Sequence, residues 1–313
     1  MSIELFRSPE HQAQHTVLSF SDLLPQAGLD TLANGQLDVT SANHFLLVHE
    51  KQGLLLDPGG TATYNGLFMA LSRYFSPKDL RYVAVSHAAP DSLHSLSRWM
   101  VGSRTELLMS QQLLPQLAHV CDPERIANRV HGIPDSGALV HCAGVEYLML
   151  SAHFLGYSAC LQLYDPISKI LFTGPLGASE GVSSQAISGQ NFHAHIHNMR
   201  SLHTRHIASR KACQLWVNMV QELDIEMLVP QRGSPIKGKE AIALFFDWIC
   251  DLPCGTDILT QDHFRIPRQN GRAAVIGWER DIEMLQNDLQ NGQLVSSNKV
   301  SVKSQETTQP IQV

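Results

Sequence analysis

Four apolar runs in the sequence each end in a loop of small, polar or charged residues, and this repetition constrains the fold more than any other feature. The segments are LLLDPGG (54–60), SHAAPDS (86–92), SAHFLGYSA (151–159) with LFTGPLGAS (171–179), and LVPQRGS (228–234). The end of a strand holds the following loop in place, and the loop then positions its side chains. Enzymes of mixed α and β structure therefore commonly gather their ligands there. We therefore expect a candidate site where these loops follow their strands.

The remaining segments predict an α+β protein in which two sheets are layered and flanked by helices. The two short apolar runs at 43–50 and 52–60 predict a hairpin, and NGLFMALSRYF (65–75) has apolar residues at helical spacing. Strands are expected at 43–50, 52–60, 81–87, 106–110, 146–155, 160–174 (two runs around Asp165-Pro166) and 225–233, and helices at 65–75, 92–101, 111–119, 203–223 and 239–252.

The C-terminal part of the chain has a different composition. We expect one domain over 1–260 with its core at about 40–260, then a strand and a helix over 261–290. That helix would present Trp278, Ile282, Leu285 and Leu289 on one face, for docking on the domain or for forming a homodimer. From Asn291 to residue 313 the sequence is poor in apolar residues, which predicts a disordered tail.

Composition excludes several classes of function. The chain has 313 residues and a formal net charge of −6, which argues against a nucleic-acid-binding protein. No run reaches the roughly 18 apolar residues of a membrane span, and the N-terminus lacks a signal core, so a cytoplasmic protein is expected. Six cysteines without a CxxC pair are expected to be reduced thiols.

The loop SHAAPDSLH raises the question of a metal site. His87 and Asp91 are spaced like ligands at the end of a strand, but Ala88, Ala89 and Pro90 between them coordinate nothing. Taken alone, this loop could be a two-ligand site or the remains of a larger one.

Taken together, the loops resemble the metallo-β-lactamase fold, and most closely the oxygen-binding diiron proteins related to the flavodiiron oxygen and nitric-oxide reductases. The resemblance covers most of residues 40–260 and includes YDPISKILFTG, HTRHIAS and CGTDIL. It implies an αββα sandwich with a site at one edge of the two sheets. It also implies that a His, a carboxylate and an Asp should alternate in the first loop. Here they are His87, Ala89 and Asp91, and the neighbouring Ser92 offers no imidazole.

The other ligand positions that the resemblance implies have also changed. Gly156 stands where the family has a His, Pro175 stands where it has the bridging Asp, and Arg232 replaces the last His. About two of the six ligands remain. An arginine adds a permanent positive charge that no metal ligand set can use. The resemblance therefore implies a degenerate metal site.

Several side chains could act in what remains of this site. An Asp91–Arg232 ion pair beside His87 is the favoured arrangement. Alternatively, His87 and Asp91 could hold one metal with His153 or His203, and His203 and Arg205 could line the cavity. The alternating His193, His195 and His197 could form a replacement metal site if extended, although an exposed polar loop is the simpler interpretation.

The expected function is that of a catalytically inactive diiron-protein homologue that acts as a binding, regulatory or signalling module, with no cofactor. A signalling protein or a small anionic ligand are its expected partners. The alternative is an iron-containing oxygen or nitric-oxide sensor or reductase with a non-standard ligand set. A metal-dependent hydrolase is a third possibility and, like the second, requires a retained metal.

Overall fold

The computed structural model describes residues 2–9, 14–21, 42–101, 103–180 and 185–266. The chain divides into two compact units, Met1–Ile258 and Leu259–Val313. All described strands and α-helices belong to the first unit, and the described part of the second contains only the short 3₁₀ helix η5 (Gln261–His263). The strand and helix predicted within 261–290 and the tail at 291–313 lie, apart from 261–266, outside the described residues.

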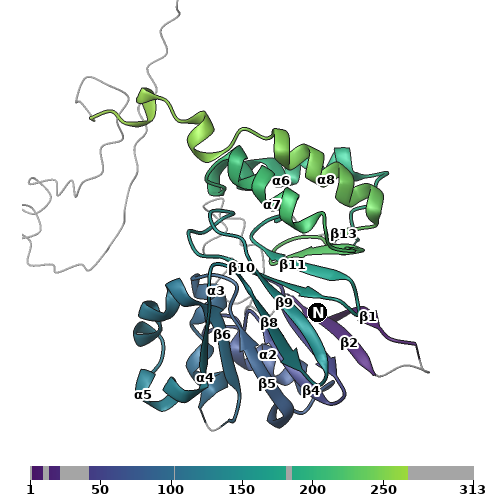
Figure 1. Cartoon of the computed structure of the whole chain (residues 1–313), viewed down its shortest axis with the longest axis vertical. Coiled ribbons are helices and arrows are strands. Elements are labelled where there is room, and N and C mark those ends of the chain that lie inside the picture. Colours follow the sequence, from purple (N-terminus) through teal and green to yellow (C-terminus); the bar gives the residue numbers. More distant parts are fainter. Residues whose placement is uncertain (1, 10–13, 22–41, 102, 181–184, 267–313) are drawn as a thin grey trace, which may run out of the picture. The chain divides into compact units, whose positions relative to one another are not determined.

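The first sheet has seven strands in sequence order (Figure 1). Strands β1 to β4 are antiparallel, and β4 to β7 are parallel. The strands are β1 (Ser2–Arg7), β2 (His15–Phe20), β3 (His44–His49), β4 (Gln52–Leu56), β5 (Leu80–Ala84), β6 (Glu106–Ser110) and β7 (Val130–Ile133).

The second sheet has six strands in the order β13-β12-β11-β10-β9-β8. Only β11 and β12 are parallel, and the other pairs are antiparallel. The strands are β8 (Ala138–Cys142), β9 (Val145–Ser151), β10 (Leu161–Asp165), β11 (Ile170–Gly174), β12 (Met227–Pro230) and β13 (Ile236–Lys237).

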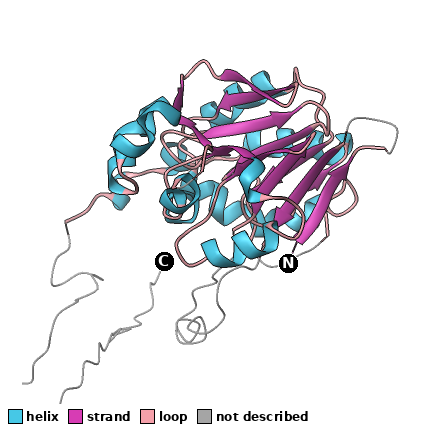
Figure 2. Ribbon diagram, turned by 90° about the horizontal axis from the view of Figure 1, so that it is seen from below, coloured by secondary structure: helices cyan, strands magenta, loops and turns pink. Residues whose placement is uncertain are grey.

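Helices cover the outer face of each sheet (Figures 1 and 2). The first sheet carries α2 (Tyr64–Leu71), α3 (Pro90–Leu93), α4 (Leu96–Met100), α5 (Pro123–Ile126) and the 3₁₀ helices η1 (Pro77–Asp79), η2 (Gln111–His119) and η3 (Ala127–Arg129). The second carries α6 (Phe192–His206), α7 (Arg210–Val220), α8 (Lys239–Asp251) and η4 (Gly255–Ile258). No described helix is long and apolar enough to cross a membrane.

Strand alternation produces three apolar layers. On β3, Leu47 faces a central cluster shared with Leu163 and Phe172 of the second sheet. Its neighbour Leu46 faces the outer cluster with Leu67 of α2. Because successive strand residues point to opposite faces, one apolar run fills two layers. A third cluster joins the second sheet to α6, α7 and α8. This is the αββα sandwich and α+β class expected from the sequence.

Several predictions about helical segments are wrong in detail. The segment 192–199 is neither extended nor a loop but begins α6, so His193 and His197 share a face and His195 does not. The predicted single helix over 203–223 is two helices, because the chain is extended from Ile207 to Ser209 and the Ser209 side chain caps α7 by accepting a hydrogen bond from Ala212 N.

The helix predicted over 92–101 is likewise divided into α3 and α4, and the segment 111–119 is a 3₁₀ helix with Pro115 inside it. The strands β1, β2, β7, β8 and β13 were not predicted. The first two carry polar residues at several positions, which weakens their apolar signal.

Candidate functional site

The loops that follow β4, β5, β9 and β12 meet at one edge of the two sheets. Ser86 N donates to Asp57 Oδ1 at 2.9 Å, and Leu161 N donates to Ser86 O at 2.7 Å. His87 forms an isolated β-bridge with Cys160, and Arg232 forms one with Ala42. Gln231 N donates to Gly174 O at 2.8 Å, and Ser179 N donates to Arg232 O at 3.2 Å. These contacts bring together the loops that the sequence singled out.

Asp57 and Ser86 form the buried base of the site. Ser86 Oγ donates to Asp57 Oδ2 at 2.8 Å. Asp57 is 1% exposed, and burial raises the pKa of its carboxyl to about 7, although the hydrogen bonds from Ser86 act in the opposite direction. Asp57 also has φ +54°, a left-handed conformation that Asp tolerates better than most residues. The loop LLLDPGG is among those expected at the site, but the sequence pattern does not single out Asp57.

His87 lies on this base as a neutral imidazole. Its Nδ1 is 2.6 Å from Ser86 Oγ, and since that hydroxyl donates to Asp57, Nδ1–H donates to Ser86. Among the described residues, its Nε2 has only a long contact of 3.5 Å with Ser92 Oγ, and that hydroxyl accepts from Gln231 Nε2 at 2.8 Å. Burial lowers the pKa of His87 to about 4.

Tyr157 covers the imidazole of His87. The two rings stack with centroids 4.3 Å apart and an interplanar angle of 29°. Tyr157 itself is 40% exposed, so it forms the boundary between the buried polar groups and solvent. The sequence offered no signal for this role beyond the proximity of Tyr157 to Gly156.

Asp91 and Arg232 form the ion pair that the sequence favoured. Arg232 Nη2 donates to Asp91 Oδ2, with side-chain exposures of 42% and 24%. Asp91 Oδ1 is buried and has no hydrogen-bond partner among the described residues. The guanidinium therefore satisfies one carboxylate oxygen and leaves the other without a donor.

Gly156 and Pro175 are in contact at the edge of the site. A Cβ atom added at Gly156 would lie 2.5 Å from Pro175 Cβ, and Gly156 has φ +114°, which side-chain-bearing residues rarely adopt. The two positions at which the resemblance implies lost ligands are therefore packed against each other, and a side chain at position 156 has no room while Pro175 is present.

The other predicted residues lie elsewhere. His153 Nε2 is 3.1 Å from Asp135 Oδ1, and its Nδ1 accepts from Cys160 N at 3.3 Å. His203 is buried, donates from Nδ1 to Met199 O at 2.7 Å and accepts from Gly177 N at 2.8 Å. Arg205 is exposed near the end of α6. Both ring nitrogens of His203 are used, so it positions the loop after Pro175 rather than supplying a ligand.

This arrangement does not fit a diiron centre. Ala89, Gly156 and Pro175 carry no donor atoms, and the guanidinium of Arg232 brings a fixed positive charge to Asp91. Across the described ranges, no group of three or more His, Cys, Asp and Glu side chains is placed to hold a metal ion.

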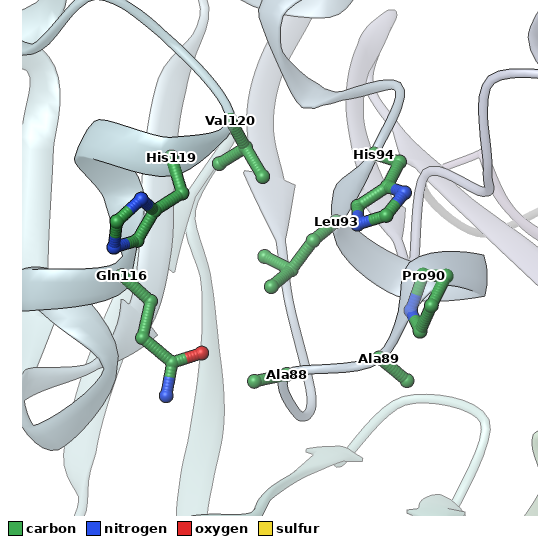
Figure 3. Close-up of a pocket in the computed structure, with 8 residues that line it drawn as sticks. All are labelled: Ala88, Ala89, Pro90, Leu93, His94, Gln116, His119 and Val120. Atoms are coloured by element: carbon green, nitrogen blue, oxygen red, sulfur yellow. The ribbon is translucent and has the colours of Figure 1, made fainter.

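A small hollow lies beside the loop SHAAPDS, between α3 and η2 (Figure 3). Its volume is about 240 Å³. Figure 3 shows His94 and His119 on opposite sides of it. The lining residues are Ala88, Ala89, Pro90, Leu93, His94, Gln116, His119 and Val120.

Comparisons with known proteins agree with this architecture. A family model described as "ODP family beta lactamase" matches residues 40–233. A chemotaxis sensor called ODP, solved as a peroxy diiron species, is 26% identical with a TM-score of 0.68, over 82% of this chain and 97% of the sensor. The apo state of the ODP sensor from T. denticola is 25% identical, with the same TM-score and coverage.

A flavo-diiron protein from Thermotoga maritima shares the fold at 16% identity and a TM-score of 0.62, over 80% of this chain and 60% of that protein. No curated protein matches the chain.

Proposed function

We propose that this chain, which belongs to the ODP family of beta-lactamase-like proteins, is a catalytically inactive member that acts as a binding or signalling module. Membership confirms the resemblance inferred from the sequence. The observation that carries the proposal is the Asp91–Arg232 pair, in which a guanidinium contacts one of the two remaining family ligands.

The chemistry of the site supports this proposal. A diiron centre needs several carboxylate and imidazole donors around two cations. Here the donors have been replaced by groups that pack against one another, as Gly156 does with Pro175. A positive guanidinium next to Asp91 opposes the binding of a second cation. The sandwich around the site nevertheless keeps its buried layers.

A signalling role is supported by the chemotaxis sensors among the similar structures. In this proposal the domain contacts a signalling protein and works in the cytoplasm. Its half-exposed Arg232 receives a small anionic ligand, and the chain forms a homodimer.

A second candidate is a metal-binding oxygen or nitric-oxide sensor with a non-standard ligand set. Two observations favour it: Asp91 Oδ1 has no partner among the described residues, and His87 Nε2 has only the 3.5 Å contact with Ser92. These two donor atoms could hold one metal, with water completing its coordination.

Elemental analysis of the purified full-length protein separates the two candidates. The inactive module is expected to contain far less than one iron, manganese or zinc per chain, with the same result for His87→Ala and Asp91→Ala. Near-stoichiometric metal that disappears in His87→Ala would overturn the proposal. A matched control is His94→Ala, which changes a neighbouring histidine of the same loop that lines the hollow of Figure 3.

A further inference from the structure

Phe154 adopts a backbone conformation that its own side chain does not explain. It has φ +65°, and a bulky residue in this region is a genuine outlier. Its side chain is not buried in compensation, because Phe154 is 56% exposed. A strained backbone that presents an apolar ring to solvent contributes nothing evident to folding, which points to a role in binding.

The loop holds this conformation by backbone contacts on both sides. Phe154 N donates to Tyr157 O at 2.8 Å, and Phe154 O accepts from Ala208 N at 3.0 Å. The next residue, Leu155, is buried and bridges to Ile207. The ring of Phe154 is therefore presented by a fixed backbone, which lowers the ordering cost of binding.

Tyr157 adds a second anchored aromatic ring to the same loop. One face of Tyr157 stacks on the buried His87, yet the residue stays 40% exposed. Rigid, partly exposed aromatic side chains are typical of the residues that dominate binding at protein interfaces.

Basic residues flank this loop. Arg205, Arg210 and Lys211 are exposed and lie within three residues of Ala208, whose amide contacts Phe154. Within the described part of the chain, none of the three forms an ion pair with a carboxylate. Asp257 Oδ2 accepts a hydrogen bond from Arg210 N at 2.6 Å and offsets part of this charge, so the positive charge that remains at the loop comes mainly from Arg205 and Lys211, on a chain with a net charge of −6.

We propose that one exposed surface of the protein binds an acidic peptide segment of a partner protein, and that this segment also carries an apolar side chain. The surface, here called the Phe154 surface, consists of Phe154, Tyr157, Arg205, Arg210 and Lys211. This inference rests on the proposed signalling role and identifies the surface that performs it. Charge complementarity selects an acidic partner. A protein segment is favoured over an anionic membrane because the clamped loop offers a fixed shape and the net charge of the chain opposes a broad negative surface.

The binding test uses short random peptides displayed on phage and selected against the immobilised full-length protein. We expect enriched peptides to be acidic and to contain a large apolar residue. Synthesised and measured by fluorescence anisotropy, they should bind Phe154→Ala about tenfold more weakly. Charge reversal in Arg205→Glu with Arg210→Glu should weaken them similarly and remove the dependence on salt.

Two matched controls lie away from this surface. Met69→Ala removes a similarly exposed apolar residue of α2, and Arg125→Glu reverses an exposed arginine of α5. Both should leave peptide binding unchanged. The surface is overturned if no peptide is enriched, if the peptides bind Phe154→Ala normally, or if vesicles of phosphatidylserine and phosphatidylcholine bind in a Phe154-dependent manner instead.

A stability measurement separates binding from folding. Phe154→Gly relieves the positive φ, so its urea midpoint should rise while peptide binding is lost. A lower midpoint would mean that Phe154 supports the fold and would overturn the inference. If the protein contains no metal and binds no peptide, only the proposal of the Phe154 surface is overturned. If the protein contains metal that depends on His87, only the proposal of an inactive site is overturned.

Discussion

Strand β10 has a buried polar cluster at each end, and the two clusters differ in how completely their groups are satisfied. At its C-terminal end, Asp165 accepts from His15 Nε2 at 2.7 Å, Ser168 Oγ at 2.5 Å and Ile167 N at 3.1 Å. His15 Nδ1 contacts His49 Nδ1 at 3.2 Å. Asp165 and His15 are both fully buried.

At its N-terminal end, next to Cys160, the cluster of Asp57, Ser86 and His87 is also buried but ends in unsatisfied or solvent-facing groups. Asp91 Oδ1 has no partner among the described residues, and the Arg232 side chain is 42% exposed. A fully satisfied buried network stabilises a fold, whereas a partly satisfied one is the usual mark of a functional or altered site. The first cluster is therefore structural, and the second forms the candidate site, where we propose that the family's metal ligands have changed.

The largest effect is expected at the satisfied end. Asp165→Asn places an amide N–H at the position to which His15 Nε2 and Ser168 Oγ both donate. Buried donors are then left unpaired, at a cost of about 3–5 kcal/mol. Urea denaturation measures the loss. Asp135→Asn is the control, because this carboxylate also contacts a histidine but is 63% exposed, and should cost below about 1 kcal/mol. Equal losses in both variants would contradict the contrast between buried and exposed pairs.

A substitution at the N-terminal end of β10 tests whether the residues allowed at positions 156 and 175 depend on each other. Gly156→His should cost about 2–4 kcal/mol because of the 2.5 Å clash with Pro175 and the positive φ. In a Pro175→Asp background the cost should be smaller by about 1 kcal/mol, since the clashing ring is gone. A double-mutant cycle by urea denaturation gives the coupling, and strict additivity would show that the two positions changed independently.

The pH dependence of stability should differ between wild type and Asp57→Asn. The pKa of His87 is lowered to about 4, below the unfolded value of 6.5, so its contribution falls as pH drops from 6.5 to 4. The pKa of Asp57 is raised to about 7, so as pH drops from 7 to 4 its contribution rises. The two oppose each other between about pH 6.5 and 4.

Asp57→Asn removes the opposing contribution, so the loss of unfolding free energy should steepen by about 1 kcal/mol per pH unit between pH 6 and 5. His203, whose pKa burial lowers to about 4, adds the same acid-induced loss in both proteins and cancels in the comparison. Parallel pH profiles for the two proteins would show that Asp57 is ionised throughout.

The smallest effect is expected for the ion pair itself. Asp91→Asn should change stability by about 1 kcal/mol or less, since both partners are partly exposed. Arg232→Met should behave in the same way, and the double variant should match the singles. A loss above about 3 kcal/mol in thermal or urea denaturation would place the pair among the buried, structural ion pairs of the first cluster.

Sequence reasoning reached the sandwich because its strands follow local patterns, whereas the changed ligand positions stay a prediction that the resemblance implies. Apolar runs predict strands, and His87, Ala89, Asp91, Gly156, Pro175 and Arg232 stand at motif positions. It missed Asp57, Gln231 and Tyr157, whose roles arise from contacts between loops far apart in the chain.

The helix α6 shows a different reason for failure. Its alternating histidines suggested an extended segment, but Phe192, Met199 and His203 are the residues that it buries, at helical spacing. Tertiary packing against α8 and the second sheet overrides the local pattern.

The central claim is that the altered site no longer holds the metal centre of its family, and anaerobic iron loading tests it directly. The full-length protein is incubated with ferrous iron without oxygen, freed of excess iron, and exposed to oxygen while its absorption spectrum is recorded. We predict no retained iron and no new absorption band, in wild type and His87→Ala alike. Retained iron with a band that forms on oxygen exposure and is lost in His87→Ala would contradict the account.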